Sequence, residues 1–238
     1  YTSWYSPLSV PEDATWEAGD IRYNVLRWTS SPSVPFSGYG PSFVNPRTGE
    51  ILGADVMLEF AGMAGRLWKS SVFTDNQNET EELTTRARTA ELMNRCDVGV
   101  SMAHNALFSI SAMKVLDLDA EEHAEFVRQT LHRLSLHEVG HTLGLSHNMH
   151  ASTMLSPEEL KDPEVVAVNG MCNSVMEYPA INFARNPEDQ TLYYDDSPGP
   201  YDYWVIEYGY SEGLKDPNLE EVRLEAILSK SNSELLQF

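Results

Sequence analysis

Residues 137–147 contain three histidines and one glutamate at spacings that could build a metal centre. His137 and His141 are four residues apart, so on a helix their side chains lie one turn apart on the same face. Two imidazoles in this arrangement can bind one Zn²⁺ ion at about 2.0–2.1 Å each. The segment therefore predicts a zinc site on a helix.

A glycine explains how a third histidine can reach the same ion. A further ligand on the next turn of a straight helix would point away from the first two. Gly144 can adopt a positive φ and end the helix in a sharp turn, which would return His147 to the ion. His150 is the alternative, and the glycine geometry favours His147. Three neutral nitrogens would leave one tetrahedral position for water, as in catalytic zinc sites.

Glu138 follows the first expected ligand, and its side chain points about 100° away around the helix. It could therefore reach a water molecule at the ion without binding the ion itself. This is the position of a general base that takes a proton from an attacking water. The alternative is a surface helix with scattered histidines, which the fixed positions of the segment disfavour.

The element that must position these residues is a long helix. Asp119 and Glu122 match a capping box, which predicts that the helix begins there and runs to about residue 143. The first two zinc ligands would then lie on its last two turns, on a rigid support. Apolar residues recur at helical spacing and are expected to face the core: Val127, Leu131 and Leu134.

Hydrophobic periodicity and breaker residues predict the other elements. Strands are expected at residues 21–28, 51–60 and 97–103. Helices are expected at residues 61–69, 79–94, 157–160, 200–208 and 219–228. Gly209 is expected to stop the helix at 200–208.

The strand at residues 51–60 is expected to lie near the active cleft. Gly53, Ala54 and Asp55 are the candidate substrate-binding residues, because an exposed strand edge could pair its backbone with an extended peptide. The alternative is an interior strand that only packs.

Composition excludes some classes of protein. The chain has 238 residues and a net charge of −20, from 36 acidic and 16 basic residues, which argues against nucleic acid as a partner. No apolar run is long enough for a transmembrane helix. Cys96 and Cys172 either form one disulfide or remain separate thiols, and neither belongs to a C-x-x-C pair that would suggest zinc binding. The first residue, Tyr1, and the abrupt C-terminus suggest a piece of a longer protein with other domains.

The histidine signature with Gly144 at its bend resembles that of the metzincin metallopeptidases. Metzincins carry a methionine-containing turn downstream, and residues 174–178 fit it. The resemblance implies that Met176 forms a hydrophobic floor beneath the histidines. It also implies that Tyr178 approaches the zinc as a swinging ligand or an oxyanion donor, as in astacin-like members; the alternative is a tyrosine that packs the pocket wall.

A wider resemblance covers most of the chain. Three segments are similar to exported bacterial zinc-dependent metalloproteases that contain a Met-zincin domain: residues 22–24 with Trp28, residues 45–51 and residues 199–204. This implies one α+β catalytic domain in two lobes. Residues 1–147 would form an upper lobe with a twisted mixed sheet and two long helices, and residues 148–238 a mostly irregular lower lobe that ends in a helix. It also implies export from the cytoplasm to the periplasm, the cell surface or the medium.

The expected function is that of a zinc-dependent endopeptidase acting on a peptide or protein substrate. One Zn²⁺ would be held by His137, His141 and His147, with Glu138 as general base and Tyr178 at the oxyanion. By resemblance, Pro179 begins a wall of the substrate pocket. The alternatives are a catalytically silent, zinc-containing peptide-binding module and a zinc hydrolase of non-peptide amides. Structural Ca²⁺ is possible, but no EF-hand loop indicates it.

Overall fold

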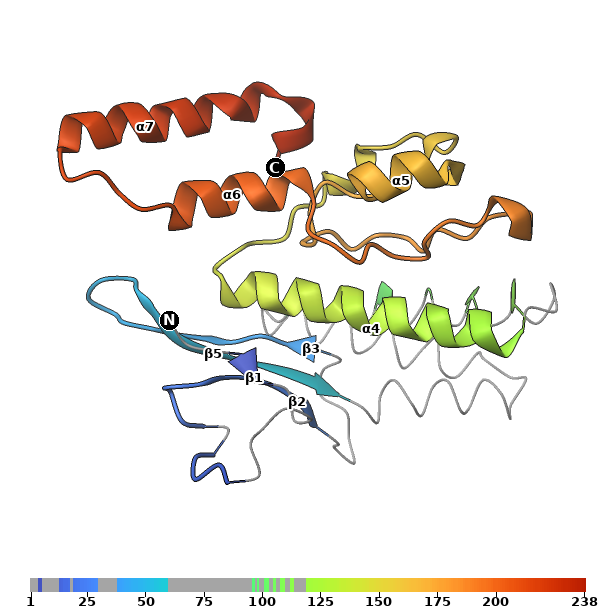
Figure 1. Cartoon of the computed structure of the whole chain (residues 1–238), viewed down its shortest axis with the longest axis horizontal. Coiled ribbons are helices and arrows are strands. Elements are labelled where there is room, and N and C mark those ends of the chain that lie inside the picture. The colour runs from blue at the N-terminus through green and yellow to red at the C-terminus, as the bar shows by residue number, and fades with distance from the viewer. Residues whose placement is uncertain are drawn as a thin grey trace. The chain divides into compact units, whose positions relative to one another are not determined.

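The computed structural model describes residues 4–5, 13–17, 19–29, 38–59, 96, 98, 101–102, 105, 108–109, 112–113 and 119–238. The chain divides into two compact units, Tyr1–Ser146 and His147–Phe238. Both strands and helices are present, so the predicted α+β class is confirmed (Figure 1). The helices expected at residues 61–69 and 79–94 lie outside the described residues.

The first unit contains a five-stranded mixed sheet and one long helix (Figure 1). The strands are β1 (Trp4–Tyr5), β2 (Asn24–Thr29), β3 (Gly38–Tyr39), β4 (Ser42–Val44) and β5 (Ile51–Glu59). Their order is β1-β2-β5-β3, and β4 also pairs with β5. The β1–β2 and β2–β5 pairs are parallel, whereas β3 and β4 run antiparallel to β5.

Strand β5 lies inside this sheet, so the prediction that it offers an exposed edge is wrong. Asp55 is paired with Val25 of β2, and Ala54 with Ser42 of β4. The amide of Ala54 donates to Asn24 Oδ1 at 2.8 Å, and that of Asp55 donates to the carbonyl oxygen of Pro41 at 3.2 Å. A peptide therefore cannot add to β5 at these residues without displacing existing hydrogen bonds.

Helix α4 (Ala120–Thr142) packs against β3 and β5 (Figure 1). It begins with the predicted capping box: Asp119 Oδ1 accepts from the amides of Glu121 at 2.8 Å and Glu122 at 3.0 Å. Glu122 Oε2 accepts in return from the Asp119 amide at 3.3 Å. These bonds satisfy donors that a helix start otherwise leaves open, which is why the sequence located this end correctly.

The buried face of α4 differs from the apolar positions in its sequence. Leu134 is fully buried, but Val127 and Leu131 are only half-buried. Most of the buried residues of α4 are polar: Gln129, Thr130, Arg133, His137, Glu138 and Thr142. Burial of Thr130 is tolerated because its hydroxyl donates to the carbonyl oxygen of Phe126 at 2.8 Å.

The strand expected at residues 97–103 is wrong at each of its described positions. Val98, Ser101 and Met102 are helical. Val98 and Met102 are both buried and lie four residues apart, which is the spacing of one helix face. The four-residue spacing of these two apolar side chains therefore indicated a helix rather than a strand.

The second unit is largely irregular, with three short helices. They are α5 (Pro163–Asn169), α6 (Pro200–Tyr210) and α7 (Pro217–Ser229). Single 3₁₀ turns are η1 (Ala151–Thr153), η2 (Glu159–Lys161), η3 (Pro187–Asp189), η4 (Lys230–Asn232) and η5 (Glu234–Leu236). Each α-helix of this unit begins with a proline, whose fixed φ suits the first helical position.

The bounds of α6 and α7 differ by no more than two residues from those of the helices expected at 200–208 and 219–228. Gly209 does not stop α6, which continues to Tyr210. The two helices pack together, and Trp204 Nε1 donates to the carbonyl oxygen of Ile227 at 2.8 Å. The helix expected at 157–160 is a 3₁₀ turn, η2.

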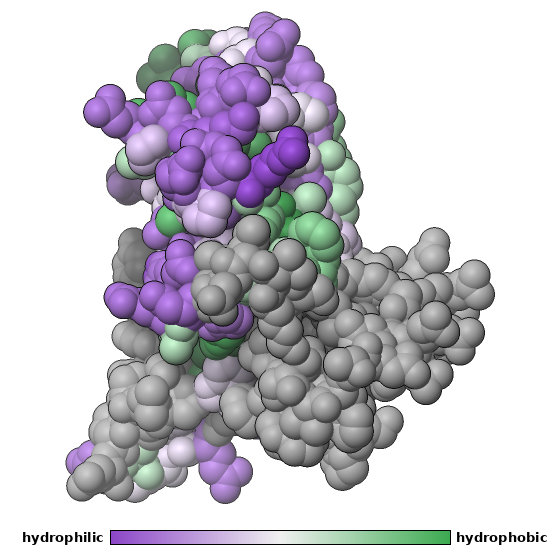
Figure 2. Space-filling view, turned by 90° about the vertical axis from the view of Figure 1, so that its right-hand side faces the viewer, coloured by the Kyte–Doolittle hydropathy of each residue, from purple (hydrophilic) through white to green (hydrophobic). Residues whose placement is uncertain are grey.

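The coloured residues on the face in Figure 2 are mostly hydrophilic, with smaller hydrophobic areas between them. Among the described helices, none is both long and apolar enough to cross a membrane.

Candidate metal centre

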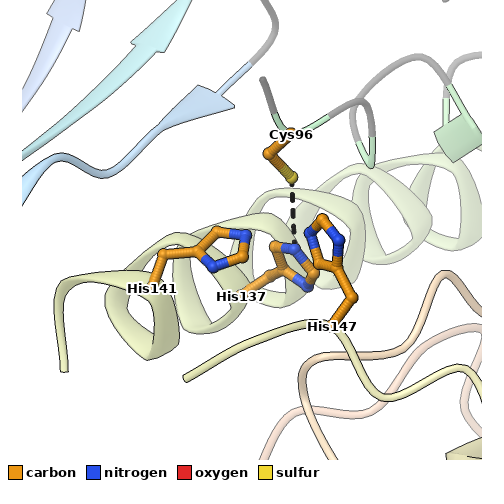
Figure 3. Close-up of side chains that lie close together, drawn as sticks. All are labelled: Cys96, His137, His141 and His147. Carbon is orange, nitrogen blue, oxygen red and sulfur yellow. Dashed lines mark hydrogen bonds between the residues drawn. The ribbon is translucent and has the colours of Figure 1, made fainter. Parts of the chain in front are cut away.

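The three histidines of the sequence signature lie together with a cysteine (Figure 3). One ligand-type atom from each of Cys96, His137, His141 and His147 lies within 4.8 Å of the others. His137 and His141 stand one turn apart on α4, with ring centroids 4.8 Å apart and ring planes perpendicular. His150, the alternative third ligand, is not part of the group found among the described residues.

Gly144 forms the bend between the second and third histidines. Its φ is +87°, a conformation that side chains with a Cβ rarely adopt. The amide of Leu145 reaches back to the carbonyl oxygen of Gly140 at 3.1 Å, and that of Gly144 to His141 at 2.9 Å, closing the helix C-terminus. A Cβ at Gly144 would meet only Ile51 Cδ1, at 4.0 Å, so backbone conformation rather than space requires the glycine.

The protonation state of His141 suits a metal ligand. Its Nδ1 lies 3.0 Å from the carbonyl oxygen of Leu145, which can only accept, so Nδ1 carries the proton. The other ring nitrogen, Nε2, then presents a lone pair. Burial lowers the pKa of His141, which keeps the ring neutral.

Cys96 is a member of the group that the sequence did not assign to metal. Its Sγ lies 3.3 Å from His137 Nε2, and His137 is fully buried. Neither Cys96 nor Cys172 takes part in a disulfide, which resolves the alternatives left open by the sequence. Cys96 precedes His137 by 41 residues and belongs to no local pattern, so no sequence signal pointed to it.

The four side chains fit a zinc ion. With Zn–N and Zn–S bonds of about 2.0–2.3 Å, two ligand atoms of a tetrahedral site lie roughly 3.3–3.6 Å apart. The Cys96–His137 distance of 3.3 Å already has this value, and the largest separation of 4.8 Å would need side chains to move inward by about 1 Å. Imidazole nitrogen and thiol sulfur are ligands that zinc prefers, and Ca²⁺, which prefers oxygen, does not suit this group.

Glu138 is buried beneath the backbone of β3. The side chain is fully buried, and neither carboxylate oxygen accepts a hydrogen bond of acceptable geometry from the described residues. A Cβ at Gly38 would collide with the Glu138 carboxyl group, and one at Gly40 with the Glu138 backbone carbonyl. Two glycines therefore allow a strand to cross the helix directly over this carboxylate. The sequence analysis did not single out either of them.

This environment changes the acidity of Glu138. Burial raises its pKa to about 8, because the charged carboxylate loses the stabilisation of water. The nearby Gly40 amide favours the charged form, but its effect is smaller. A carboxyl group with a pKa near neutrality can both take up and release a proton, which is the property of a general acid–base group.

Met176 and Tyr178 lie on one turn of the second unit. Met176 is fully buried, and its carbonyl oxygen accepts from the amide of Asn148 at 3.1 Å. The Tyr178 hydroxyl lies 3.0 Å from His147 Nε2, with the ring centroids 4.7 Å apart. The turn thus places a phenol in hydrogen-bond contact with the third histidine.

Asp202 holds this turn, and sequence reasoning missed it. Its carboxylate accepts from Ser174 Oγ at 2.7 Å, the Val175 amide at 2.8 Å and the Gly199 amide at 2.9 Å. Ser174 Oγ in turn accepts from the Met176 amide at 3.0 Å. The sequence does carry a local signal for Asp202. It is the third residue of α6, and its carboxylate accepts from the amide of the helix cap Gly199, as acidic residues at this position commonly do.

The candidate substrate-binding residues are mostly inside the fold. Ala54 and Asp55 are buried in β5, and burial raises the pKa of Asp55. Gly53 belongs to the same strand, and a Cβ there would press on the carbonyl oxygen of Ile21. Pro179, which follows Tyr178 in the chain, is also buried. Substrate contact by these four residues remains a prediction, and for the three in β5 it no longer has an exposed edge to support it.

These observations define a class: an α+β domain with a histidine cluster of metal-binding type at the end of a helix, a glycine bend and a buried methionine turn. The family comparison reaches the same class, since residues 119–238, just over half of the chain, match the Met-zincin family. The chain belongs to this family. Comparisons with curated proteins and with solved structures found no match.

Proposed function

We propose that this domain is a zinc-dependent endopeptidase. The observation that carries the proposal is the convergence of His137, His141 and His147 within 4.8 Å, with the buried carboxyl of Glu138 on the same helix. Membership of the Met-zincin family supports the same reaction. Bound by the three imidazoles, Zn²⁺ would supply Lewis acidity toward water and the scissile carbonyl.

Glu138 is proposed to move the proton. It would take a proton from the attacking water and deliver it to the leaving amine. Its pKa of about 8, raised by burial, suits both steps near neutral pH. The cover provided by Gly38 and Gly40 limits bulk water around the carboxyl, which strengthens electrostatic interactions there.

Tyr178 is proposed to donate a hydrogen bond to the oxyanion that develops on the scissile carbonyl. Its hydroxyl is already 3.0 Å from His147 Nε2 and would have to turn away from this nitrogen when the ring binds metal. A donor aimed at a developing oxyanion typically contributes a factor of roughly 10²–10³ in rate. His147 and Tyr178 belong to the same compact unit, so the contact between them is internal to that unit.

A catalytically silent, zinc-containing peptide-binding module is the second candidate. The observation in its favour is Cys96, because a fourth protein ligand beside three histidines would leave no position for water. The intact carboxyl of Glu138 favours the enzyme, since a binding module has no use for a buried acid without hydrogen bonds from the described residues.

The test is digestion of a mixed peptide library by the purified chain, with products read by mass spectrometry. Cleavage should stop when a chelator removes zinc and return when zinc is added. His141→Ala should lose both bound zinc and cleavage, and His132→Ala on the same helix should keep both. If a peptide hydroxamate binds the zinc-loaded protein but neither the wild type nor Cys96→Ala cleaves any peptide, the silent module is correct.

A further inference from the structure

We propose that Cys96 is a fourth protein ligand of the metal centre and that its thiolate closes the position that catalysis needs open. The resting site would then be a Cys-His₃ site. This inference rests on metal binding by the three histidines, as in the proposed function. It adds a latent state, which ends when the thiolate leaves.

The geometry that supports a fourth ligand lies within the first unit. Cys96 Sγ points toward the ring of His137, and Figure 3 shows the sulfur facing the histidine cluster. The Sγ–Nε2 distance is 3.3 Å, which equals the separation of two ligands on one tetrahedral zinc ion, roughly 3.3–3.6 Å. The distance between these two atoms therefore already suits a common ion.

The chemistry of the donor set favours a closed site. Zinc with four protein ligands of the cysteine and histidine type is characteristic of structural sites, which hold no reactive water. A thiolate is also the strongest zinc ligand in this group. An ion bound by all four side chains would be held tightly and would not be exposed to a peptide carbonyl.

Opening this site is a ligand exchange without oxidation or reduction. The Cys96 thiolate leaves with its electron pair and takes a proton from solvent, and one water molecule takes its place. Alkylation of the zinc-free protein removes this ligand permanently: iodoacetamide forms a sulfur–carbon bond on Cys96, and iodide leaves. Cys96 is only half-buried, so such a reagent can reach it.

The competing explanation of the 3.3 Å contact is a hydrogen bond between the Cys96 thiol and His137. In that case the sulfur never binds the ion, and the metal-loaded protein contains no metal–sulfur bond. The two explanations therefore differ in spectroscopy as well as in activity.

Cobalt substitution of the full chain separates them. Co²⁺ bound to thiolate shows a sulfur-to-metal charge-transfer absorption in the near ultraviolet, whereas Co²⁺ bound only by imidazoles does not. We expect this band in the wild type and in the control Cys172→Ala, which removes the other thiol. Cys96→Ala should lose the band, keep the visible cobalt bands and cleave peptides faster than the wild type.

Each outcome decides between named alternatives. Visible cobalt bands without the charge-transfer band in the wild type would overturn the role of Cys96 and leave the metal site intact. Failure of the wild type to bind Co²⁺ would overturn the proposed function as well.

If Cys96→Ala does not fold, alkylation of the wild type gives the answer. Bound zinc should protect Cys96 from iodoacetamide, as located by peptide mass mapping, and removal of zinc should abolish the protection. Equal alkylation of Cys96 with and without zinc would contradict the proposal.

Discussion

Two buried carboxylates, one in each unit, show opposite environments. Glu138 of α4 accepts no hydrogen bond of acceptable geometry from the described residues, and burial raises its pKa to about 8. Asp202 of α6 accepts three hydrogen bonds at 2.7–2.9 Å and holds the turn that carries Met176. Both side chains are less than 5% exposed, so burial alone does not distinguish them.

The difference fits the proton-transfer role proposed for Glu138 and a structural role for Asp202. A buried charge is stable when donors surround it, and Asp202 has such donors from two backbone amides and one hydroxyl. Glu138 lacks them, which costs stability and leaves a carboxyl group that is ready to exchange protons. The comparison predicts that substitutions at the two positions will have separable effects on activity and on folding.

The largest expected effect is that of Glu138→Gln on activity. Loss of the proton acceptor should reduce kcat by roughly 10²–10⁴-fold, with zinc content unchanged. The melting temperature should stay near that of the wild type, because no hydrogen bond from the described residues is lost. Peptide cleavage, metal analysis and thermal unfolding of the same preparation measure all three. Wild-type cleavage by this variant would exclude Glu138 as the base.

Asp202→Ala should have the opposite profile, with its main effect on stability. Two buried amides and one hydroxyl would lose their acceptor, which should lower the free energy of unfolding by roughly 3–5 kcal/mol. Asp216→Ala is the matched control, because it removes the cap of α7 and should cost about 1 kcal/mol. Denaturant unfolding compares them, and equal losses would show that the hydrogen bonds of Asp202 are not special.

Gly38→Ala should affect both properties moderately. Its Cβ would collide with the Glu138 carboxyl, so β3 or the side chain must move, at a cost of about 1–3 kcal/mol. Peptide cleavage should fall because the proposed base, Glu138, is displaced. Gly19→Ala is the control, since a Cβ there meets nothing within 4 Å. If both variants unfold and cleave alike, the close approach of β3 to the base has no consequence.

The smallest expected effect concerns a carboxylate at the surface. The Arg223 guanidinium bonds to Glu220 at 2.8 Å and is the main cause that lowers the pKa of Glu220 from 4.5 to about 2. The stabilisation by this pair is present above the ordinary pKa and is lost as the pH falls toward 2. Arg223→Gln should therefore lower the melting temperature slightly at pH 6 and not at pH 2. A constant difference between the two proteins across this range would contradict the assignment.

Features encoded within one turn of helix could be predicted from the sequence. The capping box at Asp119, the spacing of His137 and His141 and the positive φ of Gly144 all depend on neighbours fewer than five residues away. The sequence therefore located α4, its end and the three histidines of the cluster.

Features that depend on distant segments could not be predicted in this way. Cys96 reaches His137 across 41 residues, and Asp202 reaches Ser174 across 28. The interior position of β5 depends on which strands pair on each side, which its own alternation does not reveal. Gly209 failed as a stop because a single glycine costs a helix only about 1 kcal/mol.

The backbone cover over Glu138 has a practical consequence for anyone who shortens this protein. The family match starts at Asp119, so a fragment cut to residues 119–238 would retain the histidines and the glutamate. It would discard Gly38, Gly40 and Cys96. In such a fragment the Glu138 carboxylate would be exposed to solvent, and its proton affinity would fall to that of an ordinary glutamate. A bound ion would also lose its sulfur ligand. Assays on that fragment would therefore not test the activity proposed for the whole chain.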